Sequence, residues 1–136
     1  MKKSQLLILP LFLICITPLI AFAGDFDGSV PLICAVIETI ECGEDGKCQN
    51  GTADSINIPQ FLKINFKTKT ISGKRGEEKK TTKIENMERS DGKLILQGTQ
   101  TRKGWSMVID ETTGKMAITA SGDQVGFVVF GACTPQ

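Results

Sequence analysis

The sequence predicts a small all-β domain, an antiparallel meander of about eight strands that closes, or nearly closes, into a barrel of lipocalin-like plan. Three observations predict this fold. Short segments with β-branched or alternating apolar residues recur along the chain, turn residues separate them, and no stretch sustains a helical period. A small β-sandwich is the alternative, because it is built from strands of the same kind.

The first 23 residues have the three parts of a signal peptide. Two lysines precede an uncharged run over residues 6–22, which ends in Ala21-Phe22-Ala23, a small-x-small exit. A transmembrane anchor is the alternative, but two internal prolines argue against it. We therefore expect cleavage after Ala23, a periplasmic or secreted product, and a single disulfide-bonded β domain over residues 24–136.

Residues 24–29 are polar and glycine-rich, which indicates a loose leader. The first strand is expected at residues 32–41, where both faces are apolar, and a short helix is the alternative there. Residues 42–54 are rich in glycine, asparagine and acids and should form a loop.

After Pro59 the strand and turn signals alternate regularly. Residues 73–80 should form a charged loop, Asp91-Gly92 is a favoured hairpin dipeptide, and Arg102-Lys103-Gly104 should form a further turn. The strands expected in this part are residues 61–66, 70–72, 81–87, 93–99, 105–110, 115–120 and 125–133.

The first and last of these strands are the most apolar, so we expect them to pair and close the sheet, which would remove its exposed edges. Four cysteines remain after signal cleavage, and an even number in an exported chain predicts two disulfides. Cys34 and Cys133 lie on apolar faces of the first and last strands, which favours a Cys34–Cys133 bridge across the seam. Cys42–Cys48 would then close the acidic loop.

No enzyme class is favoured by the sequence. The chain has no histidine and no tyrosine, its mature cysteines are expected to be paired, and its adjacent acids fall in predicted turns. The cysteine spacings fit no zinc motif. We expect a protein without catalytic activity, metal or cofactor, and without a nucleic-acid partner.

Trp105 is the only tryptophan, and it shares a strand face with apolar residues. One interpretation places it in the core. The other places it at the mouth of a pocket beside Arg102 and Lys103, where an aromatic ring and two cations would bind an anionic amphiphile.

Charge is distributed unevenly, because the basic residues are concentrated in residues 61–103 between two acidic segments. Such a segment favours anionic surfaces such as lipid headgroups, unless the fold interleaves it with the acids. If it forms one surface, Lys74, Arg75, Lys79 and Lys80 should lie on one exposed loop near Arg102 and Lys103. We expect at most weak peripheral membrane contact.

Several stretches together resemble an uncharacterised family of small exported bacterial proteins. They are residues 31–38, 51–53 with 59–61, Gly104-Trp105-Ser106, residues 110–114 and residues 125–133. The resemblance covers most of the mature chain and implies a bacterial periplasm, but it implies no activity. In overall plan the chain is also similar to small periplasmic lysozyme inhibitors of the MliC type.

From these features we expect a non-enzymatic exported binding module for a small apolar or amphiphilic ligand. The alternative is a protein-interaction module, such as an inhibitor of a cell-envelope hydrolase. A ligand binder needs an internal cavity, whereas an interaction module can be solid inside and needs an exposed patch.

Overall fold

The structure, a computed structural model, describes residues 26–136 and is all-β over that range. Ten antiparallel strands form one curled sheet, which confirms the predicted fold class. The signal peptide predicted for residues 1–23 lies outside the described residues. The strands are β1 (Leu32–Gly43), β2 (Cys48–Gly51), β3 (Phe61–Asn65), β4 (Thr70–Arg75), β5 (Glu78–Lys83), β6 (Asn86–Ser90), β7 (Lys93–Gln100), β8 (Lys103–Asp110), β9 (Lys115–Ser121) and β10 (Val125–Pro135).

Apart from β2, which pairs with β1, the strands follow an up-and-down order in which each pairs with its neighbour in sequence. The first and last strands, β1 and β10, pair with each other as predicted, and Cys34 lies opposite Cys133. The order is interrupted at one place in the described part of the chain, because β5 and β6 form the two edges of the sheet. The barrel is therefore nearly closed, with its gap between two consecutive strands.

The chain crosses this gap at Ile84 and Glu85, and hydrogen bonds hold the crossing in place. The amide of Glu85 donates to the carbonyl of Gln97 on β7 at 2.8 Å, and the amide of Ile84 donates to Lys69 at 2.9 Å. These bonds hold the linker against the β3–β4 turn and against β7 at one end of the gap.

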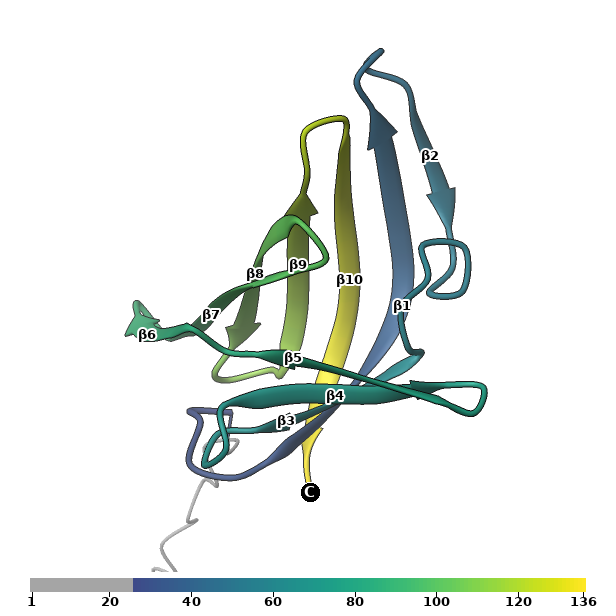
Figure 1. Cartoon of the computed structure of the whole chain (residues 1–136). Helices are drawn as coiled ribbons and strands as arrows, with labels where there is room; N and C mark the ends of the chain where they lie inside the picture. Colours follow the sequence, from purple (N-terminus) through teal and green to yellow (C-terminus); the bar gives the residue numbers. More distant parts are fainter. Residues whose placement is uncertain (1–25) are drawn as a thin grey trace, which may run out of the picture.

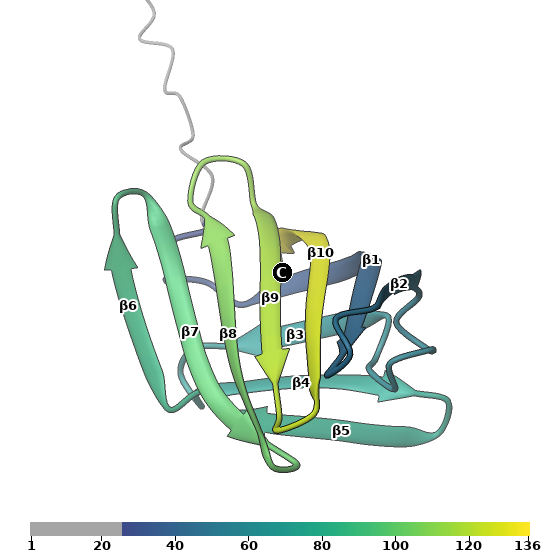
Figure 2. The same ribbon diagram turned by 90° about the horizontal axis from the view of Figure 1, so that it is seen from above.

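The sheet folds over itself because β1 belongs to both of its halves. Its first residues pair with β3, its whole length pairs with β10, and a β-bulge lies between Val36 and Glu38. Figure 1 shows β1 and β10 side by side at the centre of the molecule. In Figure 2, β3, β4 and β5 cross beneath β6–β10 at a steep angle, so the inner faces of the two halves enclose the core.

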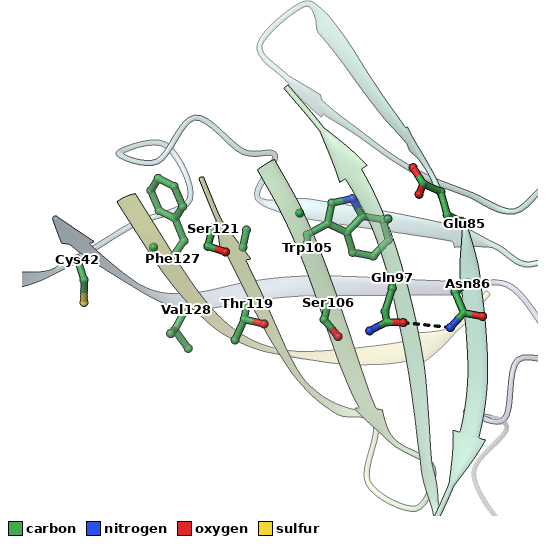
Figure 3. Close-up of a pocket in the computed structure, with 14 residues that line it drawn as sticks. Cys42, Glu85, Asn86, Gln97, Trp105, Ser106, Thr119, Ser121, Phe127 and Val128 are labelled. Atoms are coloured by element: carbon green, nitrogen blue, oxygen red, sulfur yellow. Dashed lines mark hydrogen bonds between the residues drawn. The ribbon is translucent and has the colours of Figure 1, made fainter. Parts of the chain in front are cut away.

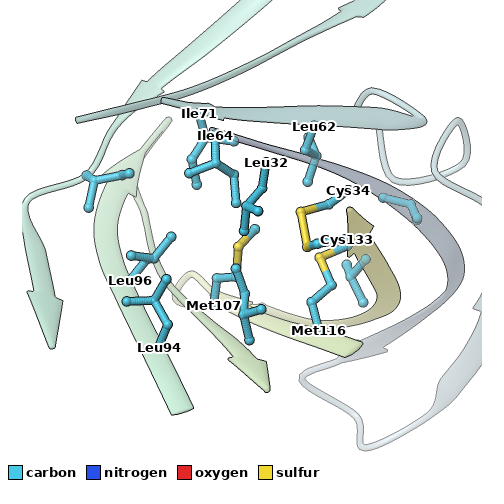
Figure 4. Packing of buried hydrophobic residues seen from close by; sticks show 14 of the residues in the cluster. Leu32, Cys34, Leu62, Ile64, Ile71, Leu94, Leu96, Met107, Met116 and Cys133 are labelled. Carbon is cyan, nitrogen blue, oxygen red and sulfur yellow. A yellow bond between two sulfur atoms is a disulfide. The ribbon is translucent and has the colours of Figure 1, made fainter. Parts of the chain in front are cut away.

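The core lies between these two halves (Figure 4). Alternate residues of β1, β3, β7 and β8 point into it, as expected for a sheet with one buried face. Leu32, Ile64, Leu94, Leu96, Met107 and Ile109 are almost completely buried.

Both predicted disulfides are present. Cys34 and Cys133 are buried in the core and join β1 to β10, while Cys42 and Cys48 join β1 to β2. Two disulfides are consistent with an oxidising, exported environment. In residues 26–136 no helix has the length and apolar character needed to cross a membrane.

The number of strands differs from the eight expected, for two reasons. Residues 42–54 were expected to be a loop, but β1 continues to Gly43 and β2 pairs with it as a polar hairpin that shows no apolar alternation. The single strand expected at residues 81–87 is two strands, β5 and β6, because the chain changes partner at Ile84 and Glu85. The helix considered for residues 32–41 is wrong, since these residues are strand.

Three predicted loops are also corrected. Residues 73–80 are mostly strand, because Gly76, with φ of 58°, turns the chain so tightly that β4 and β5 pair up to Arg75 and Glu78. Lys103 and Gly104 belong to β8, and the turn before them is Thr101–Arg102. In the predicted leader, Phe26 packs against the core.

Candidate functional site

A cavity of about 310 Å³ lies inside the barrel, next to the core. Its walls come from both halves of the sheet and are mostly apolar, and Trp105 forms part of them. Other apolar residues that line it are Leu62, Ile71, Ile118, Phe127 and Val129. This volume is at the lower end of the range of ligand pockets, about 300–1,000 Å³.

The two-residue period of the strands places these side chains. On β8, Lys103, Trp105 and Met107 occupy successive inward positions, so this strand contributes a cation, an aromatic ring and a thioether from the mouth to the core. Phe127 and Val129 follow the same rule on β10. The cavity is therefore graded from polar at its mouth to apolar inside.

Trp105 is seated on Gly98, its partner on β7. A β-carbon built on Gly98 would lie 2.6 Å from Cζ2 of the indole, so only glycine leaves room for the ring. The indole Nε1 is buried and has no hydrogen-bond partner among the described residues. A buried, unpaired donor costs about 1–3 kcal/mol, and native structures contain few of them. A ligand acceptor that reached this N–H would remove the cost.

Two lysines, Lys80 and Lys103, line the mouth. The ammonium of Lys80 donates to the backbone oxygen of Asn57 at 3.0 Å and to its Oδ1 at 3.3 Å. The Nζ of Lys103 lies 6.0 Å from the centroid of the Phe127 ring. Among the described residues that line the cavity, none is acidic.

One side of the mouth is covered by the segment before β3, residues 52–60. Ile56, Asn57 and Ile58 line the cavity, while Ala53 is almost fully buried and fixes the base of the segment. The amide of Ile58 donates to the carbonyl of Ala53 at 3.0 Å, which folds the segment into a compact turn. Nothing in its sequence other than its isoleucines indicated that it would face a cavity.

The predicted site residues separate into two groups. Trp105 and Lys103 line the cavity together, whereas Arg102 lies in the β7–β8 turn and is not among the lining residues. Lys80 was expected on an exposed loop, but it is the second cation of the mouth. Lys80 lies on the inner face of β5. Its sequence is charged and bracketed by glycines, so this strand was not predicted.

The predicted exposed basic loop is wrong. Lys74 and Lys79 pair across β4 and β5, and Arg75 forms an ion pair with Asp54 at 3.0 Å. Lys80 lines the cavity. The four cations therefore do not form one exposed basic surface. The fold interleaves basic and acidic segments, which the uneven charge along the chain did not reveal.

A second hollow, a trough of about 690 Å³, lies on the outer face of β7–β10 (Figure 3). Gln97, Ser106 and Thr119 line it, and so do Trp105, Ala120 and Phe127, which the trough shares with the cavity. Its polar groups are amides, hydroxyls and the carboxylate of Glu85, and Asn86 Nδ2 donates to Gln97 Oε1 at 3.0 Å. It is broader and more open to solvent than the cavity, so the cavity is the candidate site.

Within residues 26–136, no cluster of three or more cysteine, aspartate or glutamate residues is arranged to hold a metal ion. The chain matches no model of a known protein family, and the search of curated proteins gave no match either. The resemblance to a family of small exported bacterial proteins therefore stays a prediction.

Proposed function

We propose that the domain is a non-enzymatic exported binding module that holds a small apolar or amphiphilic ligand in the interior of its barrel. The observation that carries this proposal is the cavity of about 310 Å³, which has apolar walls and a polar mouth. Apolar walls that face an open cavity are in contact with water, which is unfavourable. A ligand that fills the cavity would remove these walls from water.

The chain contains its own reporter for a binding experiment. Trp105 is the single tryptophan, no tyrosine is present, and its ring lies in the cavity wall. We expect decanol, added below its solubility limit, to shift and enhance the tryptophan emission in a saturable manner. Native mass spectrometry of protein purified from its own periplasm should show whether a ligand is retained.

A pair of variants on β9 tests whether binding occurs inside the barrel. Ala120 lines both the cavity and the trough, whereas Ala117 lies on the outer face of the same strand and lines neither. We expect Ala120→Leu to fill the space and weaken decanol binding at least about tenfold, and Ala117→Leu to bind like the wild type. Equal binding by both variants, or an emission that decanol does not change, would refute the proposal.

A second candidate function, a protein-interaction module, is favoured by one observation. Ile37, Phe61 and Phe130 are exposed by 72%, 56% and 44%, and strand pairing brings them to one region of the outer face over β3, β1 and β10. Ile37 faces outward by the alternation of β1, and the bulge leaves it without a partner on β10. Exposed apolar clusters of this kind are typical of protein-binding surfaces.

The inhibitor form of this candidate has a direct test. If the domain inhibits a muramidase, purified protein should slow peptidoglycan hydrolysis, and Ile37→Lys with Phe130→Lys should abolish the effect while leaving the cavity intact. Unchanged hydrolysis at every concentration of the domain would exclude this form.

A further inference from the structure

We propose that the ligand is a single-chain anion, whose charged head lies between the ammonium groups of Lys80 and Lys103 while its apolar chain passes inward along Trp105. This inference rests on the proposed function, and it adds the charge of the ligand and the number of its chains.

The first argument is the charge of the mouth. Lys80 and Lys103 are the charged groups among the described lining residues, and both are cations. Several other cations of the domain are neutralised by carboxylates, as in Arg75–Asp54, Arg89–Glu111 and Lys93–Asp110. In the described part of the chain no carboxylate lies within ion-pair distance of Lys80 or Lys103. Two cations without an acid, beside apolar walls, leave an anion as the complementary ligand group.

The second argument is that Lys80 is held in place before any ligand arrives. An ammonium group has three N–H donors, and two acceptor atoms of Asn57 hold it at 3.0 Å and 3.3 Å. A third donor remains for a ligand. Asn57 itself has a φ of 66°, a left-handed conformation that fixes its carbonyl and side-chain oxygens around the ammonium. Ordering the lysine in advance lowers the entropy cost of binding an anion.

The third argument is the position of Lys103. It lies one inward step from Trp105 on β8, so its half-buried stem runs beside the aromatic wall formed with Phe127. The ammonium therefore marks the boundary between the apolar interior and the solvent. A ligand whose head contacts this group must place its apolar part inside.

The volume limits the apolar part. About 310 Å³ is at the lower end of the pocket range, which suits one short chain and excludes the two chains of a membrane phospholipid. An inorganic anion would use the lysines but leave the apolar walls unfilled. The complementary chemistry is therefore a carboxylate or sulfate on a single alkyl chain.

The test compares four probes by Trp105 fluorescence: decanoate, decanol, decyltrimethylammonium and inorganic phosphate. We expect decanoate to bind about tenfold more tightly than decanol, the scale of one charge-assisted hydrogen bond, and decyltrimethylammonium and phosphate to bind most weakly. Each methylene added between octanoate and decanoate should strengthen binding about fourfold.

Three variants locate the charge preference. Lys80→Met and Lys103→Met should each remove most of the preference of decanoate over decanol. Lys79→Met is the matched control, because Lys79 is the neighbour of Lys80 on β5 and does not line the cavity. Lys80→Glu with Lys103→Glu should reverse the selectivity, so that decyltrimethylammonium binds more tightly than decanoate.

The outcomes separate this inference from the proposed function. If decanol and decanoate bind equally in the wild type, or if the double glutamate variant keeps its preference for decanoate, the anion assignment is wrong although the cavity binds ligands. If no decyl compound changes the emission of Trp105, the proposed function fails and this inference fails with it.

Discussion

Gly98 and Gly104 lie close together on β7 and β8, but a side chain at each would meet different surroundings. A β-carbon at Gly98 would lie 2.5 Å from the carbonyl oxygen of Lys83 and 2.6 Å from the Trp105 ring, whereas one at Gly104 would meet no atom within 4 Å. Gly98 is thus required by packing, because it forms the seat of the indole. Gly104 is not.

This contrast gives the first prediction. Gly98→Ala should destabilise the domain by about 1–3 kcal/mol, because the backbone at Lys83 cannot move away easily, and should shift the Trp105 emission. Gly104→Ala is the control and should change stability by less than about 0.5 kcal/mol. Urea unfolding followed by tryptophan fluorescence measures both. Similar stability of the two variants would contradict the claim that the Trp105 indole requires glycine at position 98.

The second prediction concerns the turn between β7 and β8. Thr101 and Arg102 have φ of 50° and 64°, left-handed values that favour glycine or asparagine. Arg102→Gly should therefore stabilise the domain by about 1 kcal/mol. Because Arg102 does not line the cavity, decanoate binding should stay unchanged. Arg102→Ala removes the same side chain without relieving the conformation, so a gain there as large as with glycine would refute this explanation.

At the scale of elements, the turn between β8 and β9 is organised by one carboxylate. Asp110 accepts hydrogen bonds from Lys93 at 2.6 Å and from the amides of Thr112 and Thr113 at 2.9 and 2.8 Å. The Lys93 ammonium, followed by Thr113 and Thr112, lowers the pKa of Asp110 well below its ordinary 3.8. The charged form therefore stabilises the folded state.

The third prediction follows from the sign of this shift. Since the folded pKa is lower than the unfolded one, the contribution is complete above about pH 4 and is lost as the pH falls through the folded pKa. Asp110→Asn should be less stable than the wild type at about pH 7, and the difference should narrow toward about pH 2. Urea midpoints over this range measure it. A constant difference at every pH would show that Asp110 acts through shape alone.

The fourth prediction compares the two disulfides. Cys34–Cys133 spans 99 positions and Cys42–Cys48 spans 6, so the chain-entropy model assigns them about 4.7 and about 2.4 kcal/mol. Replacing the first pair by alanine should threaten folding, because small domains have a stability of only about 5–15 kcal/mol. Replacing the second pair should mainly release β2. Equal losses in urea unfolding would contradict this ranking.

The elements that could be predicted from sequence are those with a strong local signal. Asp91-Gly92 forms the predicted hairpin turn, with φ of 50° and 72°, and the apolar first and last strands pair as expected. β2 was missed because its sequence has no apolar alternation. Pairing with β1 and a disulfide stabilise it instead. Lys80 could not be assigned to the cavity, because its facing depends on the register of β5 with β4, which no local pattern encodes.

For the whole molecule, the position of the gap determines which strands resist local unfolding. β1 and β10 lie in the middle of the sheet and share a buried disulfide, whereas β5 and β6 are its edges. All five residues of β6 are exposed, and the sequence of β5 is mostly charged or polar. Charged, exposed edges oppose pairing with other chains.

The fifth prediction is that stability is graded in the same way. Amides of β6 and of the first half of β5 should exchange with solvent faster, by local opening, than those of β1 and β10, which should exchange only by global unfolding. Hydrogen exchange with mass spectrometry measures this. A bound decanoate should protect β5 near Lys80 more than β6. Uniform protection of all strands would show that β5 and β6 open only when the whole domain unfolds, which would contradict this prediction.

The bridge between the first and last strands also constrains how the protein is made. Synthesis starts at the amino terminus, so Cys42 and Cys48 follow Cys34 closely, whereas its true partner comes 99 positions later. An oxidant that acts on the growing chain therefore meets the thiols of Cys34, Cys42 and Cys48 before Cys133 exists, and short loops close most readily. Native pairing then requires Cys34 to stay reduced, or a wrong bridge to be exchanged by another thiolate. The yield of this protein should depend on a disulfide isomerase more than on oxidising strength.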